Sequence, residues 1–590
     1  MLQIGTLDRQ YIIDVRCTNL NPLKPILEDP NTVLVGHNIK FEYKHLLNHN
    51  IKINNVYDTM IVEQILHNGL QFPKLGKRVN DVIKNYDGYS LEDLLYRYLQ
   101  KQVVKTTRLE FVDIQSKPFT ETQIKYGAED IIFPLKIKEL QSSGIVQKDV
   151  GNCVSLEMLF LLVVGDLEYK GMYFNQHLWA EAYDKNKLKF TSLQSELDNF
   201  VLFNYPNSVF VDKQLNLFSD ELKCRIQWTS SKQVVGLFQY LDICPMEVSK
   251  STGKLSPTVN ASVLRANLND IEDTSKKDLI GIYLQLKEAE QSITTFGIAF
   301  FKYVNPITNR LHSNYKQILN TGRISSSSPN LQNIPSKPEF RKAFDCADGY
   351  NIVNADYSGQ EQIILANKSE DKDLQSFYDR GLSDMHSFIA SKIYPELSEL
   401  SLDEIKTSHK EKRQIAKAAG FAINYGGTGF TISKNLGIPV EQGDEVYTAY
   451  FKAFPNLKKY FNKVQKESLR RGYILIDPIT GRKNWFTRPK NNKERGKIQR
   501  AALNFPIQGE AGGITKYAPI LFRKWIMDNK LEDVIFITNI VHDEINVEVR
   551  SDYAQLAADN LELCMSKAAD KWCKTIKLTA DAVITKYWNH

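Results

Sequence analysis

The pattern of apolar and polar residues changes along the chain, and the first region combines a strand pattern with a helix pattern. Residues 1–150 combine short apolar runs, at 11–15 and 32–35, with helical spacing such as that of residues 91–99. Short apolar runs of this kind are typical of strands, whereas spacing of three and four residues is typical of helices. The pattern predicts an α/β domain that ends near Gly151.

The middle of the chain is predicted to be mainly helical. Residues 155–203 and 276–303 carry apolar side chains at helical spacing. Between them, about residues 204–257 lack a clear period, which predicts a loop-rich region. A polar hinge rich in Ser, Gly, Asn and Pro follows at residues 321–335.

The last third alternates between strands and helices. Residues 350–355 are a strand candidate that ends on Asp356, and residues 384–530 are mostly helical in pattern. Residues 534–541 and 545–549 are two apolar runs separated by His-Asp-Glu, which predicts a β-hairpin.

Composition limits the class of protein but does not identify its function. The chain has 590 residues, 42% of them hydrophobic and 24% charged, which predicts a globular protein of about three or four domains. The net charge of +6 is too small to indicate a nucleic-acid partner by itself. The chain has no apolar run of membrane-spanning length and no signal-peptide pattern at its start. The seven cysteines are scattered without CxxC pairs, so we expect reduced thiols in a cytoplasmic protein without membrane contact.

Two acidic residues stand where predicted strands end. Asp356 follows the first of these strands, and Asp543 lies at the tip of the predicted hairpin. Carboxylates held at neighbouring strand ends can bridge two divalent cations about 3.5–4 Å apart. Taken singly, an Asp in such a place is more typical of a turn or a helix cap. Only the pair makes a candidate metal site.

One predicted helix face combines cations with aromatic residues. Arg413, Lys417, Phe421 and Tyr425 follow one another at intervals of four residues. Cations on the early turns fit a triphosphate, and aromatic side chains further along fit a base and a sugar. The alternative is a solvated basic helix whose aromatic residues pack in a core.

Further polar side chains are suited to a DNA duplex. Arg500, Asn504 and Gln508 are again spaced by four residues, and Thr-Gly-Arg at 321–323 lies upstream. Arg, Asn and Gln reach acceptors in the minor groove and on the sugar–phosphate backbone. Residues 482–500 add a basic run with a single acid, which is supportive only, because such runs are usually solvated faces.

In this order, these segments resemble the motifs of DNA polymerase family A. Residues 356–361 are similar to motif A, residues 413–426 to motif B and residues 541–544 to motif C. Thr-Gly-Arg and Pro-Asn-Leu-Gln-Asn-Ile-Pro, at 321–323 and 329–335, precede them as in that family. The resemblance covers about residues 155–590 and extends more weakly to residue 1.

The resemblance implies a multi-domain α+β fold. An incomplete ribonuclease H-like 3′–5′ exonuclease domain is expected over residues 1–150, followed by a right-hand polymerase domain over 151–590. Within the second domain, the expected divisions are a thumb at about 151–305, a palm at about 306–370 and 500–590, and fingers at about 371–499.

The implied activity is template-directed DNA synthesis from a primer 3′-hydroxyl in DNA replication, with dNTPs as substrates. Asp356, Tyr357 and Asp543 would hold two Mg²⁺ ions, and the catalytic set would be Asp356, Asp543, Lys417 and Glu544. The residues implied for dNTP binding are Arg413, Lys417, Phe421, Tyr425, His386, Glu361 and Gln360. Those implied for primer–template binding are Arg323, Asn330, Gln332, Arg500, Asn504, Gln508 and His542.

Several positions depart from the family pattern. Motif B has Gly420 and Ala422 where Asn and Gly are common, which we expect to tune closure of the fingers. Phe421 stands where some relatives carry Tyr, which predicts discrimination against dideoxynucleotides. Glu361 is expected to exclude the ribose 2′-hydroxyl.

The exonuclease resemblance is partial. Asn38, Glu42, Tyr126 and Asp130 are similar to remnants of its second and third motifs, with Glu42 where Asp is usual. The Asp-x-Glu of the first motif is missing, because Asp14 is followed two residues later by Arg16. Too few carboxylates remain for two metals, so proofreading is expected to be lost or weak. A missing upstream segment, a neighbouring polypeptide or a mispredicted start would explain the gap.

Two alternatives remain open at this stage. A single-subunit RNA polymerase shares the acidic pair and a similar helix, although Glu361 argues against it. A non-catalytic DNA-binding scaffold would be expected to lose a metal ligand, and both Asp356 and Asp543 are present. Besides primer–template DNA and dNTPs, a processivity factor is a possible partner that the sequence does not identify. The setting expected is a bacterial or bacteriophage-infected cell.

Overall fold

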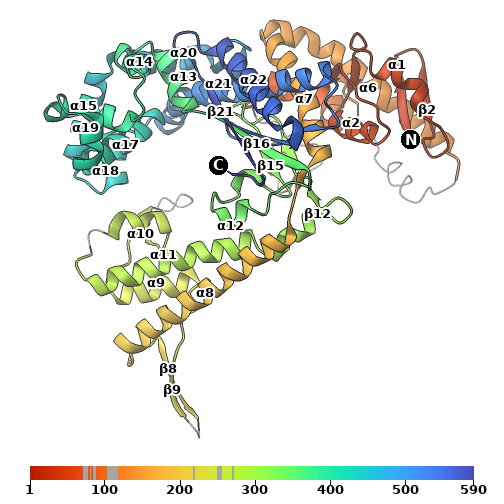
Figure 1. Ribbon diagram of the computed structural model, residues 1–590. Coiled ribbons are helices and arrows are strands. Elements are labelled where there is room, and N and C mark those ends of the chain that lie inside the picture. The colour runs from red at the N-terminus through yellow and green to blue at the C-terminus, as the bar shows by residue number, and fades with distance from the viewer. Residues whose placement is uncertain are drawn as a thin grey trace.

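The computed structural model describes residues 1–70, 78–79, 82–83, 88–101, 117–216, 219–248, 255–268 and 271–589. Figure 1 shows a central sheet with three extensions: the N-terminal region, a long helical arm, and a group of helices on the opposite side from the N-terminal region. Parts of the predicted domain over 1–150 and of the predicted loop-rich region lie outside the described residues.

The N-terminal region is α/β, as its mixed pattern predicts. Its strands pair in twos, with β1 and β2 antiparallel and β3 and β4 parallel. The elements are β1 (Leu2–Gly5), β2 (Gln10–Ile13), α1 (Lys24–Leu27), β3 (Leu34–Gly36), α2 (Lys40–Leu47), β4 (Val56–Asp58), α3 (Thr59–Leu66), β5 (Arg78–Val79), β6 (Val82–Ile83), α4 (Leu91–Leu99) and α6 (Glu121–Gln147). Side-chain caps fix several helix starts: Ser90 and Thr120 each form a capping box.

The helical arm is built on two long antiparallel helices, α8 and α11, which have a hydrophobic core of their own with Leu197, Trp228 and Tyr283. Two elements precede the arm, α7 (Gly151–Lys170) and β7 (Met172–Tyr173). The elements of the arm are α8 (Gln176–Asn204), β8 (Val211–Asn216), β9 (Ser219–Cys224), α9 (Ser231–Tyr240), β10 (Met246–Val248), β11 (Leu255–Pro257), α10 (Ala261–Asn267) and α11 (Thr274–Thr295). The prediction of a loop-rich region was wrong, since two hairpins and α9 occupy it. A hairpin of short strands can form through backbone pairing of neighbouring residues, and its sequence then needs no apolar period.

The central sheet has four antiparallel strands in the order β19 (Ile535–Val541), β20 (Glu544–Arg550), β16 (Tyr350–Tyr357) and β21 (Ala580–Thr585). One face is apolar and packs against α7, α21 (Asn492–Asp528) and α22 (Ala554–Trp572) through residues such as Val353, Ala355 and Val547. The opposite face is polar: Asn354 contacts Asn546, and Arg310 forms an ion pair with Glu548. Carboxylates at the end of this sheet therefore lie on a face built for polar groups.

The predicted strand over 350–355 and the predicted hairpin over 534–549 are confirmed. The strands of the sheet and several elements around it follow in chain order. These are β12 (Val304–Asn305), β13 (Arg310–Leu311), β14 (Asn314–Lys316), β15 (Ser325–Ser327), α12 (Pro338–Arg341), β16 (Tyr350–Tyr357), β19 (Ile535–Val541), β20 (Glu544–Arg550), α22 (Ala554–Trp572) and β21 (Ala580–Thr585).

The predicted helical stretch is confirmed, with one short hairpin inside it. Its elements, with the two helices before it, are α13 (Gln360–Ser369), α14 (Lys372–Asp379), α15 (Met385–Ile393), α16 (Leu402–Ser408), α17 (Lys410–Asn424), α18 (Gly429–Leu436), α19 (Val440–Ala453), α20 (Pro455–Arg471), β17 (Tyr473–Asp477), β18 (Arg482–Trp485) and α21 (Asn492–Asp528). Figure 1 shows α14 to α19 grouped on the side away from the N-terminal region.

One helix joins two cores. In α7, Cys153, Met158 and Leu162 face the N-terminal core, while Phe160 and Val164 belong to the main core. Because α7 belongs to both cores, the domain boundary at residue 150 stays a prediction. The boundaries at 305, 370 and 499 also stay predictions. Among the described residues, no helix is long and apolar enough to cross a membrane.

Candidate active site

The two predicted metal-binding carboxylates come together at one end of the central sheet. Ala355 of β16 lies opposite Ile545 of β20, so Asp356 is placed beside the turn that holds Asp543. That turn consists of His542 and Asp543 between β19 and β20, and His542 has a positive φ of 55°. The hairpin thus presents Asp543 from the strand next to that of Asp356.

Asp543 is partly withdrawn from water. Burial raises its pKa, and the charge of Glu361 acts in the same direction, while His542 and Arg323 lower it. A desolvated carboxylate next to a second one is well suited to a hard divalent cation, which supplies the missing positive charge. Among the described residues, no group of three or more His, Cys, Asp and Glu side chains is arranged to hold a metal ion. The donor set is a pair of carboxylates with nearby backbone oxygens.

The neighbours of this pair have different surroundings. The Tyr357 side chain is buried and its hydroxyl donates to the Met565 carbonyl at 2.8 Å, so only the backbone oxygen of Tyr357 remains as a candidate metal ligand. Glu544 is buried and accepts a hydrogen bond from Trp588 Nε1 at 2.6 Å. Gln360, also buried, donates to the Ala511 carbonyl and Thr515 Oγ1. These contacts make Gln360 an anchor between α13 and α21, with its side chain directed into the protein.

Glu361 is held by contacts from two distant segments. Arg323 Nη2 forms an ion pair with Glu361 Oε1, and the Tyr425 hydroxyl donates to Glu361 Oε2 at 3.3 Å. Tyr425 is the C-cap residue directly after α17, and Glu361 lies in the first turn of α13, so this contact joins the end of one helix to the start of the other. The structure therefore brings to Glu361 two residues that lie 38 and 64 positions away in the sequence.

The predicted cation–aromatic face of α17 is exposed. Phe421 and Tyr425 are 51% and 46% exposed, which overturns the alternative in which these aromatic residues pack in a core. Arg413 donates twice to Asp384, from Nε at 2.9 Å and Nη2 at 3.0 Å. The Lys417 side chain is half-buried beside them.

Asp384 and His386 complete this face. Burial alone would raise the pKa of Asp384, but hydrogen bonds from Arg413 and Ser387 outweigh it and hold that pKa below its usual range. Burial and the charges of Lys417 and Arg413 lower the pKa of His386, whose ring lies 6.2 Å from that of Phe421. A neutral imidazole beside two cations can donate a hydrogen bond to an anionic ligand.

Three of the predicted DNA-contacting residues lie together, and the others differ in their exposure. Arg323, Gln332 and His542 line one small cavity together with Gly512 and Lys516. Asn330 is exposed and accepts from the backbone N–H of Gln332 at 3.0 Å. On α21, Arg500 is exposed, and Asn504 and Gln508 are half-buried.

The basic run predicted over residues 482–500 contains both exposed and buried cations. Arg488, Lys490, Lys493, Arg495 and Lys497 are exposed. Arg482 and Lys483, by contrast, are buried: Arg482 forms an ion pair with Glu157, and Lys483 Nζ donates to the Lys148 carbonyl at 2.6 Å. Their inclusion in a solvated phosphate-binding run was wrong, because both serve contacts inside the protein.

The exonuclease-like residues are near one another, with one carboxylate that the sequence reasoning missed. Desolvation by surrounding atoms, with the charges of Asp58 and Asp130, raises the pKa of Glu42 to about 7 although its side chain is exposed. Asp58 is buried and accepts backbone hydrogen bonds from Asn38 and Ile39. Asp58 is the last residue of β4 and the N-cap of α3, and it accepts from the Met60 and Ile61 N–H groups. An Asp at the start of a helix is read from the sequence as an ordinary cap, so its closeness to Glu42 was not predicted.

The other exonuclease-like residues differ in their surroundings. Asp130 accepts from Gln3 Nε2 at 3.5 Å, Asn38 is exposed, and Tyr126 is half-buried on α6. Asp14 forms an exposed ion pair with Arg16 at 2.6 Å, and this hydrogen-bonded pairing lowers its pKa to about 2.

A family model described as DNA polymerase family A matches residues 213–590, well over half of the chain. The chain belongs to DNA polymerase family A. A second model, described as 3′-5′ exonuclease, matches residues 1–141.

Similar proteins are bacterial members of this family. DNA polymerase I of Pseudomonas aeruginosa is 24% identical over 586 residues, covering 97% of this chain and 58% of that protein. DNA polymerase I of Aquifex aeolicus is 25% identical over 620 residues, covering 100% and 93%. The chain thus spans less than two thirds of the Pseudomonas protein.

One solved structure has the same fold. It is described as the POL domain of Pol1 from M. smegmatis in complex with DNA primer-template and dNTP. It has a TM-score of 0.78 and 22% sequence identity, covering 98% of this chain and 90% of that one.

The family A site has a further carboxylate that was not predicted. Asp581 of β21 lies directly opposite Asp356 in the sheet register, and its Oδ2 accepts from the Ser358 hydroxyl at 3.0 Å. The sequence alone does not pair residues 225 positions apart, so this neighbour became visible only in the folded sheet.

Proposed function

We propose that this chain is a DNA-directed DNA polymerase, which copies a template by adding dNTPs to a primer 3′-hydroxyl during DNA replication. The observation that carries the proposal is the placement of Asp356 and Asp543 at one end of the sheet, beside Glu361. Tyr425 connects Glu361 to the α17 face that carries Arg413 and Lys417. Membership in family A supports the same conclusion.

In this proposal, Asp356, Asp543 and the Tyr357 carbonyl would hold two Mg²⁺ ions, because hard divalent cations prefer oxygen ligands. When bound, the ions activate the 3′-hydroxyl and offset the charge that develops on the phosphates. Glu544 supports the hairpin that carries Asp543. Asp384 fixes the Arg413 guanidinium in place.

The same helix face would position the nucleotide. Arg413, Lys417 and His386 bind the triphosphate oxygens, and Lys417 is placed to act on the leaving pyrophosphate. Phe421 and Tyr425 present exposed rings to the base and sugar. Gln360 contributes by holding α13 on α21, which keeps Glu361 in place.

Primer–template DNA would bind on the side of the pair that carries Arg323, Asn330, Gln332 and His542. Arg500, Asn504 and Gln508 extend this surface along α21, and the exposed cations from Arg488 to Lys497 supply contacts to phosphates. The processivity factor and the bacterial or bacteriophage setting stay predictions from the sequence.

The deciding experiment is extension of a labelled primer–template with dNTPs, with NTPs, or with no nucleotide. Extension with dNTPs and Mg²⁺ is the expected result. Extension that prefers NTPs would favour an RNA polymerase. Tight binding of the primer–template without extension would favour a non-catalytic scaffold.

Glu361 is expected to determine sugar selectivity. Its carboxylate is held between Arg323 and Tyr425, and we propose that it occupies the space of a 2′-hydroxyl. Glu361→Ala should raise the efficiency of ATP relative to dATP opposite template thymine by about 100-fold. The measurement is the ratio of kcat/KM values. A Glu441→Ala variant, changed at an exposed glutamate of α19, should leave the ratio unaltered, and an unaltered ratio in Glu361→Ala would reject the assignment.

Proofreading is expected to be lost or weak. The charges of Asp58 and Asp130 act on Glu42, but residues 1–16 contain no Asp-x-Glu that would supply the further ligands of two metal ions. Incubation of the purified protein with Mg²⁺ and a labelled single strand should release no nucleotide from the 3′ end at a rate above that of Asp130→Ala. Rapid Mg²⁺-dependent release that Asp130→Ala abolishes would contradict this expectation.

A further inference from the structure

The tight turn from Leu319 to Arg323 carries the arginine that holds Glu361. The Gly322 N–H donates to the Leu319 carbonyl at 2.8 Å, and the Leu319 N–H donates to the Arg323 carbonyl at 3.0 Å. Gly322 has a φ of +86°, and a Cβ there would lie 2.9 Å from Cδ of Arg482. The backbone that presents Arg323 is therefore set by the segments packed around this turn.

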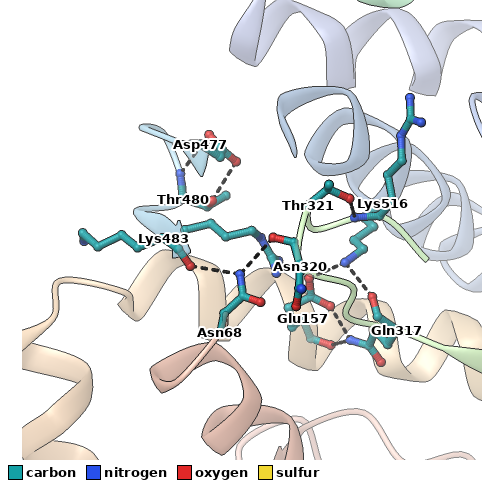
Figure 2. A network of polar contacts seen from close by, with 11 residues as sticks. Asn68, Glu157, Gln317, Asn320, Thr321, Asp477, Thr480, Lys483 and Lys516 are labelled. Atoms are coloured by element: carbon teal, nitrogen blue, oxygen red, sulfur yellow. Dashed lines mark hydrogen bonds and ion pairs between the residues drawn. The ribbon is translucent and has the colours of Figure 1, made fainter. Parts of the chain in front are cut away.

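A residue of the N-terminal region reaches this turn directly. Asn68 is 5% exposed and follows α3. Its Nδ2 donates to the Asn320 carbonyl at 3.2 Å and to the Lys483 carbonyl at 3.0 Å. Figure 2 shows Asn68 between Lys483 and Asn320. Its own carbonyl accepts from the Trp485 N–H at 2.8 Å, so Asn68 is bound on both sides.

The polymerase region contributes a second donor to the same carbonyl. Asn484 Nδ2, from β18, donates to the Asn320 carbonyl at 3.3 Å. The contact is close, because a Cβ at Gly69 would lie 2.5 Å from Asn484 Nδ2. Asn68 and Asn484 therefore converge on Asn320 from different regions of the chain.

A buried ionic network supports the strand that leads into this turn. Glu157 of α7 accepts from Lys516 Nζ at 2.5 Å and from Gln317 Nε2 at 2.6 Å, and it pairs with Arg482. Figure 2 shows Glu157, Gln317 and Lys516 next to Asn320 and Thr321. With one end of the segment fixed at Gln317, the contact of Asn68 acts on the end that leads to Arg323.

We propose that Asn68 is a positioning residue for sugar selection, through which the N-terminal region acts on the polymerase site. The path runs from Asn68 to Asn320, along the turn to Arg323, and through the ion pair to Glu361. The inference rests on the proposed polymerase function and on the role of Glu361 there. It gives the exonuclease-like region a task that does not require nuclease activity.

Loss of the Asn68 donors is expected to move the turn that carries Arg323. Removing both N–H donors of Asn68 leaves the Lys483 carbonyl without this partner and the Asn320 carbonyl with Asn484 alone. Buried acceptors that lose a donor move toward other partners or water. A shift of the turn moves the Arg323 guanidinium, and the Glu361 carboxylate then loses its fixed position.

The test is Asn68→Asp, which keeps the side-chain shape and replaces the amide donors with acceptors. The kcat/KM values for dATP and ATP opposite template thymine are measured on the full chain. Their ratio does not depend on the fraction of folded enzyme, so a merely structural loss leaves it unchanged. The ratio of dATP to ATP efficiency should fall about tenfold. Asn484→Ala, which acts on the same carbonyl, should lower the ratio in the same direction.

A matched control tests the same regional interface away from the turn. Lys52 pairs with Glu532 at 3.6 Å, and this half-buried pair joins the N-terminal and polymerase regions. Lys52→Ala should leave the ratio unchanged. In addition, Asn68→Asp should have no further effect on the ratio in a Glu361→Ala background, because both changes act through the same carboxylate.

The outcomes separate this inference from the proposed function. A wild-type chain that does not extend primers would contradict the proposed function. A wild-type chain that extends primers while Asn68→Asp keeps the wild-type ratio would overturn the inference. If Asn68→Asp does not fold, Asn484→Ala decides, and an unchanged ratio in that variant overturns the inference. If Asn68→Asp lowers the ratio of dATP to ATP efficiency by the same factor in the Glu361→Ala background as in the wild type, the proposed path through Glu361 is overturned.

Discussion

Asp543→Asn should reduce single-nucleotide primer extension by at least about 1000-fold. Asparagine preserves the shape of the side chain and removes the negative charge, so one of the two carboxylates at the sheet end no longer attracts a divalent cation. The measurement is the rate of addition of one dNTP to saturated primer–template with Mg²⁺. Asp356→Asn should have an effect of the same order, because the ions need both side chains.

The loss should not come from unfolding. Burial raises the pKa of Asp543, which means that its charged form lowers the stability of the fold at neutral pH. A neutral asparagine should therefore leave the melting temperature unchanged or raise it, as expected for a functional carboxylate. Asp552→Asn is a matched control, since Asp552 is exposed beyond the other end of β20 and pairs with Arg550 at 2.7 Å. If Asp543→Asn kept a tenth of the wild-type rate, the proposed metal-binding pair would be wrong.

Glu157→Leu should lower the free energy of unfolding by about 3–5 kcal/mol. Glu157 is fully buried and balances two cations, Arg482 and Lys516, which are also buried. Leucine would leave both charges without their acidic partner in the interior. The measurement is the urea midpoint of the transition that unfolds the main core, followed by tryptophan fluorescence.

An exposed ion pair provides the control for this prediction. Lys524 and Asp528 pair at 2.8 Å on the surface of α21, and Lys524→Ala should change stability by no more than about 0.5 kcal/mol. A loss below about 1 kcal/mol in Glu157→Leu would show that the buried network is not important for stability.

The same network predicts a pH dependence. Burial alone would raise the pKa of Glu157, but the charges of Lys516 and Arg482 outweigh it, so the folded-state pKa lies below the usual value. A carboxyl with a lowered pKa contributes stability above its unfolded pKa of about 4.3 and loses it as the pH falls toward the folded value. The wild type should therefore lose more stability than Glu157→Leu between neutral pH and the acid range.

Local patterns predicted those parts of the site that lie within one element. The strand that carries Asp356, the hairpin that holds Asp543 and the helix that bears Arg413 to Phe421, with Tyr425 as its C-cap, all follow from residue spacing over short windows. Such spacing is informative because the periods of helices and strands are properties of the backbone itself. The two hairpins of the helical arm were missed because short strands can pair through their backbones without an apolar period in the sequence.

The sequence by itself determined which chemical groups are present and the local element that carries each, including the acidic pair and the cation–aromatic face. The tertiary structure decided which groups meet: Arg323 with Glu361, Asp581 with Asp356, and Asn68 with the turn that carries Arg323. It also decided that Arg482 lies buried against Glu157 and away from solvent. The physical reason is that burial and pairing depend on segments tens to hundreds of residues apart, whereas periodicity reports only the faces of a single element.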